Sequence, residues 1–240
     1  MSATILAVAG VSKQFDGFAA LTDVDLAVCK GERVGLIGPN GSGKSTLVNC
    51  FTGIVRPDSG SITFDGADIT RTPAWLRAQR GLVRTYQIPR PFPSMTLQEN
   101  IEVPLRFAAG HTLASMISDE AQVILDQIGL IDKAGLSPKG LTQVELRKLE
   151  LGRAVAARPK MLVADEAMAG LADSEVDEIL ALLLRLNGQG ISIILIEHIM
   201  RAVLMFAQRI VVLVAGCKIA DGLSDDVMRQ DEVERAYLGE

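Results

Sequence analysis

Nine consecutive residues near the N-terminus have the types and spacing of a loop that binds phosphate. The run fits the pattern G-x-x-x-x-G-K-[ST] and consists of Gly38, Pro39, Asn40, Gly41, Ser42, Gly43, Lys44, Ser45 and Thr46. Glycines let backbone N–H groups approach a polyphosphate without a Cβ in the way, and a following helix directs its positive dipole end at the same anion. We expect Lys44 to reach the β- and γ-phosphates and the Ser45 hydroxyl to bind Mg²⁺. A chance glycine turn is the alternative, but the apolar run before the loop and the helix-compatible run after it favour a nucleoside triphosphate site.

Two adjacent carboxylates end a second apolar run. Residues 160–166 read Lys-Met-Leu-Val-Ala-Asp-Glu, which predicts a buried strand followed by Asp165 and Glu166. An aspartate at a strand end can hold Mg²⁺ through water, and the adjacent glutamate can polarise an attacking water. A solvated carboxylate pair is the alternative. The phosphate loop elsewhere in the chain favours the catalytic interpretation.

Other candidate residues lie at expected strand ends or in turns. His198 follows the apolar run 191–196 and is either a γ-phosphate contact or a buried core histidine, because strand carboxyl ends form the ligand crevice of open α/β sheets. Gln87 ends the run 81–87, and the pattern alone favours a surface glutamine. Phe15 is a candidate for stacking on a base, which is worth about 1–3 kcal/mol in other systems. Phe18 competes for that role, and a core position is the alternative.

Composition limits the classes of protein to which the chain can belong. Its 240 residues carry a net charge of -5, which argues against nucleic acid as a main partner. Three cysteines without a C-x-x-C pair disfavour a disulfide framework or a zinc site and fit a reducing cytosol. The N-terminus has no basic region before its apolar residues, so we expect no signal peptide. The longest apolar runs reach about six residues, whereas a membrane-spanning helix needs about 20, so any membrane role must come through a partner.

The elements expected to position these residues alternate between strands and helices. Strands are predicted over 4–11, 21–28, 34–37, 61–66, 81–87, 160–165, 191–196, 210–214 and 218–219. Helices are predicted over 46–51, 73–80, 95–107, 119–128, 174–186, 201–206 and 224–238, with Pro73 in a first turn and Ser174 to Asp177 as a capping box. The alternation predicts a parallel sheet. Residues 88–157, which open with three prolines, are expected to form an inserted helical lobe with a joint at 110–118.

In combination, these features resemble the ATP-binding subunits of ABC transporters. The order and separations of Gly38–Thr46, Gln87, Met161–Glu166 and His198 match the Walker A loop, the Q-loop, the Walker B strand with its catalytic glutamate, and the switch histidine. The resemblance covers nearly the whole chain. It implies an α/β fold: a P-loop NTPase (RecA-like) core with an N-terminal antiparallel β subdomain and an inserted α-helical subdomain. Residues 1–240 would form one ATPase domain, with 1–87 and 158–240 as the core and 88–157 as the insertion.

The resemblance also implies residue roles, cofactors and partners. ATP and Mg²⁺ would be the cofactors. Glu166, His198, Lys44 and Gln87 would be catalytic, Phe15 and the loop 38–46 would bind ATP, and Ser45, Gln87 and Asp165 would hold the metal. Two subunits would sandwich two ATP molecules, as a homodimer or as a heterodimer with a second ATP-binding subunit. They would drive transmembrane permease subunits from the cytoplasmic face of the membrane, with a periplasmic solute-binding protein as an indirect partner and no nucleic acid.

A narrower resemblance is to the branched-chain (hydrophobic) amino acid uptake group. It rests on the runs 84–87, 93–100 and 236–239, which read Arg-Thr-Tyr-Gln, Pro-Ser-Met-Thr-Leu-Gln-Glu-Asn and Ala-Tyr-Leu-Gly. Related importers in that group carry urea or short amides, and other subunits choose the substrate.

The chain departs from this family where two subunits would meet. The signature Leu-Ser-Gly-Gly-Gln is replaced by Leu141, Thr142, Gln143, Val144 and Glu145. Val144 stands where a glycine approaches the partner's γ-phosphate, and Glu145 would add a like charge that costs about 4 kcal/mol at about 4 Å. Ala167 also replaces a proline and Ala172 an aspartate. These departures favour, as an alternative function, a subunit that clamps nucleotide, hydrolyses weakly and pairs with a second ATPase.

Overall fold

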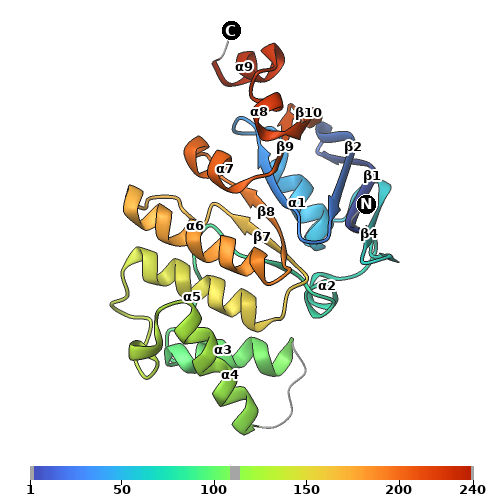
Figure 1. Ribbon diagram of the computed structural model, residues 1–240. Helices are drawn as coiled ribbons and strands as arrows, with labels where there is room; N and C mark the ends of the chain where they lie inside the picture. Colours follow the sequence, from blue (N-terminus) through green and yellow to red (C-terminus); the bar gives the residue numbers. More distant parts are fainter. Residues whose placement is uncertain (1–2, 109–113, 239–240) are drawn as a thin grey trace.

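The computed structural model describes residues 3–108 and 114–238, which form two sheets and the helices around them (Figure 1). The first sheet is antiparallel, with strand order β2-β1-β4-β5. Its strands are β1 (Thr4–Phe15), β2 (Phe18–Cys29), β4 (Ser59–Phe64) and β5 (Ala67–Asp68). Apolar and polar residues alternate along β2, which is typical of a sheet that buries one face and exposes the other.

The second sheet is the core sheet, with strand order β10-β9-β3-β8-β7-β6. Its strands are β3 (Arg33–Ile37), β6 (Leu82–Arg84), β7 (Met161–Asp165), β8 (Ser192–Ile196), β9 (Arg209–Val214) and β10 (Cys217–Leu223). All neighbours are parallel except the β9–β10 hairpin. Strands β7 and β8 are buried along their whole length, as their continuous apolar runs require in a parallel sheet that is covered on both faces.

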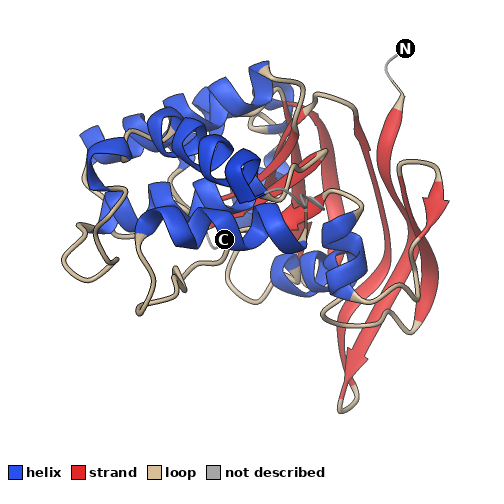
Figure 2. Cartoon of the chain, turned by 90° about the horizontal axis from the view of Figure 1, so that it is seen from below, coloured by secondary structure: helices blue, strands red, loops and turns tan. Residues whose placement is uncertain are grey.

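Helices cover the core sheet on both faces. Helix α1 (Lys44–Thr52) packs Leu47, Val48 and Phe51 into one hydrophobic cluster with residues of both sheets. A second cluster joins the other face of the core sheet to helices α3 (Leu97–Phe107), α4 (Ala114–Gln127), α5 (Gln143–Ala156) and α6 (Asp173–Gly188). Figure 2 shows most of the helices gathered on one side of the strands. The remaining helices are α2 (Ala74–Gln79), η1 (Ile131–Lys133), α7 (Met200–Phe206), α8 (Ser224–Val227) and α9 (Asp231–Leu238).

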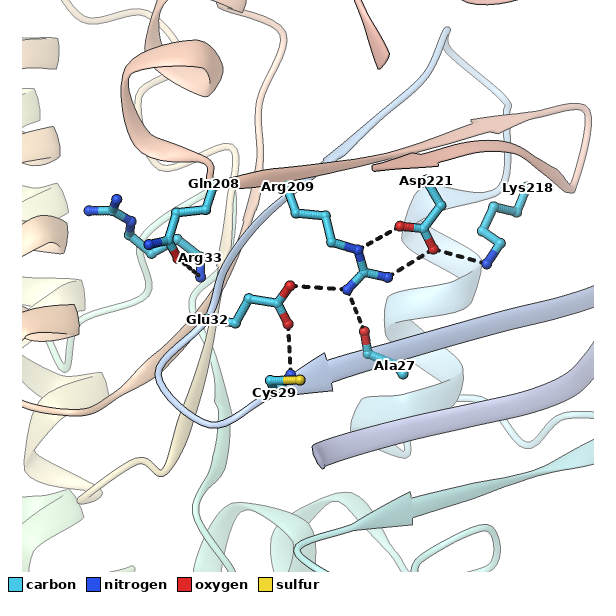
Figure 3. Close-up of polar contacts among 8 residues, drawn as sticks. All are labelled: Ala27, Cys29, Glu32, Arg33, Gln208, Arg209, Lys218 and Asp221. Atoms are coloured by element: carbon cyan, nitrogen blue, oxygen red, sulfur yellow. Dashed lines mark hydrogen bonds and ion pairs between the residues drawn. The ribbon is translucent and has the colours of Figure 1, made fainter. Parts of the chain in front are cut away.

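A half-buried ion cluster around Arg209 joins the two sheets (Figure 3). Arg209 starts β9, and its Nη1 donates to the carbonyl of Ala27 on β2 at 2.8 Å and to Glu32 Oε1 at 3.1 Å. Its Nε and Nη2 donate to the two carboxylate oxygens of Asp221 at 2.6 and 2.8 Å, and Lys218 also binds that carboxylate. The guanidinium therefore links the core sheet to the antiparallel sheet through charge-assisted hydrogen bonds.

The structure corrects four of the predicted elements. Strand β6 ends at Arg84, so Gln87 lies three residues beyond it. Helix α6 begins at Asp173, and Glu175 rather than Asp177 caps it by accepting the Ala172 N–H at 2.9 Å. Pro73 is the N-cap of α2 and not a first-turn residue.

The closing helix expected over 224–238 is also wrong, because the segment forms two helices, α8 and α9. Val227 and Val233 both join one buried cluster, whereas a single helix would place them about 120° apart around its axis. The joint expected at 110–118 falls partly outside the described residues, and residues 114–118 of it belong to α4. Within residues 3–108 and 114–238, no helix has the length and apolar character needed to cross a membrane.

Candidate functional site

A cleft at the carboxyl ends of the core strands contains most of the predicted site residues. Its volume is about 310 Å³, and it is lined by Phe15, Phe18, Ala20, Asn40, Gly41, Ser42, Gly43, Lys44, Ser45, Thr46, Glu166 and His198. Phe15 is 44% exposed and lines the cleft, so its alternative assignment to the core is wrong. Phe18 lines the same cleft, and the choice between the two rings for base stacking therefore stays open.

The phosphate loop has backbone conformations that require glycine at defined positions. Gly43 has a φ of 101° and is the N-cap of α1, which begins at Lys44. A Cβ on Gly43 would lie 2.7 Å from the carbonyl oxygen of Ala20, and one on Gly38 would lie 2.1 Å from that of Leu213. The loop can therefore pass close to its neighbours only with glycine there, and the first N–H groups of α1 border the cleft.

Lys44 is buried and directed onto its own loop. Its Nζ donates to the carbonyl oxygens of Gly38 at 2.7 Å and Pro39 at 3.0 Å. Burial lowers the pKa of the Lys44 ammonium, while the carboxylates of Glu166 and Asp165 act in the opposite direction. The ammonium therefore lies in the loop where a phosphate would bind, and it would exchange loop carbonyls for phosphate oxygens.

Glu166 contacts two other predicted residues, and the three residues follow three adjacent strands. Gln87, beyond β6, donates from Nε2 to Glu166 Oε2. His198, beyond β8, places Nε2 at 3.3 Å from Glu166 Oε1. The side chain of His198 is 47% exposed, so the core-histidine alternative is wrong. Gln87 is exposed, as the pattern alone favoured, and it also has a defined partner in Glu166.

Asp165 forms an ion pair that was not predicted. Its Oδ2 lies 2.6 Å from Arg84 Nη2, and Arg84 Nη1 binds Asn49 Oδ1 on α1. In the sequence, Arg84 stands out only as part of the run 84–87. Its partner could have been found only from the register of β6 against β7, which pairs Arg84 with Val163.

The donor atoms near the cleft suit Mg²⁺. Ser45 contributes a hydroxyl that lines the cleft, Asp165 contributes a carboxylate at the end of β7, and Gln87 contributes an amide oxygen three residues beyond β6. The Arg84 ion pair engages Oδ2 of Asp165. Among the described residues, no group of three His, Cys, Asp or Glu side chains could hold a metal by itself. A magnesium ion here would therefore depend on few protein oxygens together with nucleotide phosphates and water, as is common for this metal.

The signature segment lies outside the cleft and caps α5. Thr142 is the N-cap, its Oγ1 accepts the Glu145 N–H at 3.3 Å, and Glu145 Oε2 accepts the Thr142 N–H at 3.0 Å. Glu145 Oε1 also pairs with Lys133 Nζ at 2.5 Å. Val144 is buried in the helical core. The segment thus keeps a complete capping box despite its unusual residues.

Comparison with known proteins identifies the family. Residues 21–169 match the ABC transporter family. The high-affinity branched-chain amino acid transport ATP-binding protein BraF of Pseudomonas aeruginosa is 37% identical over 254 residues, and LivG of Escherichia coli is 35% identical, each alignment covering 100% of both chains. The lipopolysaccharide export system ATP-binding protein LptB of Haemophilus influenzae is 32% identical over 99% of this chain and 98% of that one.

Solved structures agree with this assignment and with the predicted fold. A nucleotide-free ATP-binding cassette from an ABC transporter superposes with a TM-score of 0.90 at 31% identity, covering 99% of this chain and 100% of that one. A cassette in its ADP conformation gives 0.88 at 30% identity, with both chains fully covered. The chain belongs to the ABC transporter family and is an ATP-binding subunit that hydrolyses ATP.

Proposed function

We propose that this subunit is the motor of an importer for branched-chain or other amino acids. The observation that carries the catalytic part is the contact of Glu166 with both Gln87 and His198, next to the phosphate loop. The names of BraF and LivG, which match over the whole chain, support the substrate class. The subunit would act on the cytoplasmic face of the membrane by moving transmembrane permease subunits, with a periplasmic solute-binding protein as an indirect partner.

The site geometry supports in-line attack of water on the γ-phosphate. Glu166 would accept a hydrogen bond from the attacking water and polarise it, and His198 would contact the γ-phosphate. Lys44 and the loop N–H groups would bind the phosphate oxygens as negative charge redistributes. Ser45, Asp165 and Gln87 would hold Mg²⁺, which neutralises phosphate charge when bound.

Phosphate release by the purified chain tests these roles. We expect Glu166→Gln to lower kcat by at least about 100-fold, since general-base assistance contributes factors of that size, while ATP binding persists. Glu232→Gln on α9 is the matched control, because Glu232 is exposed and lies on a helix that does not line the cleft. Unchanged turnover in Glu166→Gln would refute the role of Glu166.

A weakly hydrolysing subunit that pairs with a second ATPase is the other candidate. It is favoured by Val144 and Glu145, which replace a glycine and a glutamine of the usual signature. The two candidates differ in what the chain does alone. Sigmoidal ATP dependence with normal turnover by the homodimer supports the motor, whereas turnover that appears only on adding a second ATP-binding subunit supports the clamp.

A further inference from the structure

Glu197 is a buried carboxylate that the mechanism above does not use. It lies between the end of β8 and His198, and it is only 3% exposed. Its Oε1 accepts the backbone N–H of Met168 at 2.8 Å. Because Glu197 itself follows β8, its side chain joins the segment that follows β8 to the segment that follows β7.

The backbone of Glu166 needs such support. Its φ of 47° lies in the left-handed region, which costs a residue with a side chain energy unless its surroundings fix it. Two hydrogen bonds flank the residue: the Glu166 N–H donates to the Ile196 carbonyl at 2.9 Å, and the Met168 N–H donates to Glu197. The first is an ordinary backbone bond between neighbouring strands, whereas the second depends on one side chain.

The charges around Glu197 agree with a fixed, buried acceptor. The pKa of Glu197 is raised to about 7, mainly by burial and also by the nearby Glu166 carboxylate, while the Met168 N–H and Arg147 act in the opposite direction. Arg147 reaches the same region from α5, where it donates to the carbonyls of Gln87 and Ala169. The strand-end segments that carry Gln87, Glu166 and His198 are therefore joined through two side chains, Arg147 and Glu197.

We propose that Glu197 is a positioning residue of the ATPase, which holds Glu166 in its left-handed conformation and thereby keeps the Glu166 carboxylate beside His198. The proposal rests on the roles proposed above for Glu166 and His198. In this role Glu197 accepts a hydrogen bond at a distance set by the length of its side chain, and it transfers no proton. A side chain of the same length with an oxygen acceptor should therefore replace it, whereas a shorter carboxylate should not.

Three variants of Glu197 test this on the full chain, with phosphate release and nucleotide binding measured separately. We expect Glu197→Gln to keep kcat within about fivefold, because its amide oxygen can accept the Met168 N–H. We expect Glu197→Asp and Glu197→Ala to lower kcat at least about 50-fold, with the dissociation constant for nucleotide changed less than about threefold. Ser192→Ala is the matched control, since Ser192 is fully buried at the other end of β8 and accepts the Gly31 N–H at 2.9 Å.

The outcomes separate this proposal from a structural role and from failure of the proposed mechanism. If Glu197→Ala does not fold, the comparison of Gln with Asp decides. The proposal is overturned if Glu197→Asp keeps its turnover while Glu197→Gln loses it, or if all three variants keep their turnover. It is also overturned if kcat and nucleotide binding are lost to the same extent. A kcat loss in Ser192→Ala as large as in Glu197→Asp also overturns it. If Glu166→Gln hydrolyses ATP normally, the mechanism fails, whatever the Glu197 variants show.

Discussion

Replacing Lys133 by methionine is expected to impair ATP-driven pairing of subunits without unfolding the chain. Lys133 Nζ binds Glu145 Oε1 at 2.5 Å, and the other oxygen of Glu145 accepts the Thr142 N–H. The hydrogen bond from Lys133, with that from Thr142, holds the pKa of Glu145 below its usual value. In Lys133→Met, Glu145 keeps the hydrogen bond from the Thr142 N–H, and a glutamate carboxylate is ordinarily ionised at pH 7. The variant therefore leaves an unbalanced negative charge at the N-terminus of α5, where we expect the partner's phosphate.

The expected effect on function exceeds the expected effect on stability. The lysine side chain is 40% exposed, so losing the pair costs only about 1 kcal/mol of folding free energy. An unbalanced charge about 8 Å from a phosphate charge costs about 2 kcal/mol at an effective dielectric near 20, which is about 30-fold in apparent ATP affinity. Salt screens this repulsion, so the effect should shrink as ionic strength rises.

Turnover against ATP concentration, at about 20 mM and about 300 mM salt, measures this effect. Lys133→Met should raise the half-saturating ATP concentration by about 10- to 30-fold at low salt, and adding Glu145→Gln should restore it. Lys148→Met is the control, because Lys148 lies on α5, the helix that carries Glu145, and pairs with Glu178 at 2.6 Å. The reasoning fails if the control behaves like Lys133→Met, or if the double variant is as impaired as the single one.

Three further predictions concern stability. Arg209→Met should lower the free energy of unfolding at pH 7 by about 2–3 kcal/mol in urea denaturation, because it removes the cation that pairs with Glu32 and leaves Asp221 with Lys218 alone; a loss below about 0.5 kcal/mol would contradict this. Val144→Gly should cost about 2–3 kcal/mol through lost burial and helix propensity and should not raise turnover; a more active variant of normal stability would favour the weakly hydrolysing candidate. Because the pKa of Glu197 is raised to about 7, the native state binds more protons than the unfolded chain between about pH 4.5 and 7. Wild-type stability should therefore fall by up to about 3 kcal/mol relative to Glu197→Gln as pH rises through that window, and parallel curves for the two proteins would refute it.

Short-range sequence patterns were enough to predict the elements whose structure depends only on neighbouring residues. The loop 38–46 and the strand before Asp165 were predictable, because glycine spacing and a continuous apolar run specify a turn and a buried strand without reference to distant residues. The length of β6 was not predictable. The strand ends where its pairing with β7 ends, and the Thr85 N–H makes the last bond, to the Val163 carbonyl at 2.9 Å.

Partners contributed by other segments could not be predicted from the pattern. Nothing near Asp165 in the sequence indicates Arg84, which is 81 residues away, and nothing near Glu145 indicates that Lys133 of η1 binds its carboxylate. From the sequence alone, Glu145 is a free charge near an anion. The folded chain instead provides a cation and a backbone N–H for that carboxylate, so the electrostatic cost assigned to the substitution is reduced by its surroundings.

The order of the core strands explains why movement of α5 must reach the catalytic residues. Strands β6, β7 and β8 are neighbours, so the segments beyond them bring Gln87, Glu166 and His198 into contact. Arg147 of α5 donates to the Gln87 carbonyl and to a carbonyl beyond β7. A displacement of α5 relative to the core sheet must either break these charge-assisted bonds or carry the backbone of Gln87 with it. Gln87 binds the Glu166 carboxylate directly, so movement of the Gln87 backbone with α5 also moves a partner of that carboxylate. The position of α5 and the geometry of Glu166 are therefore mechanically linked.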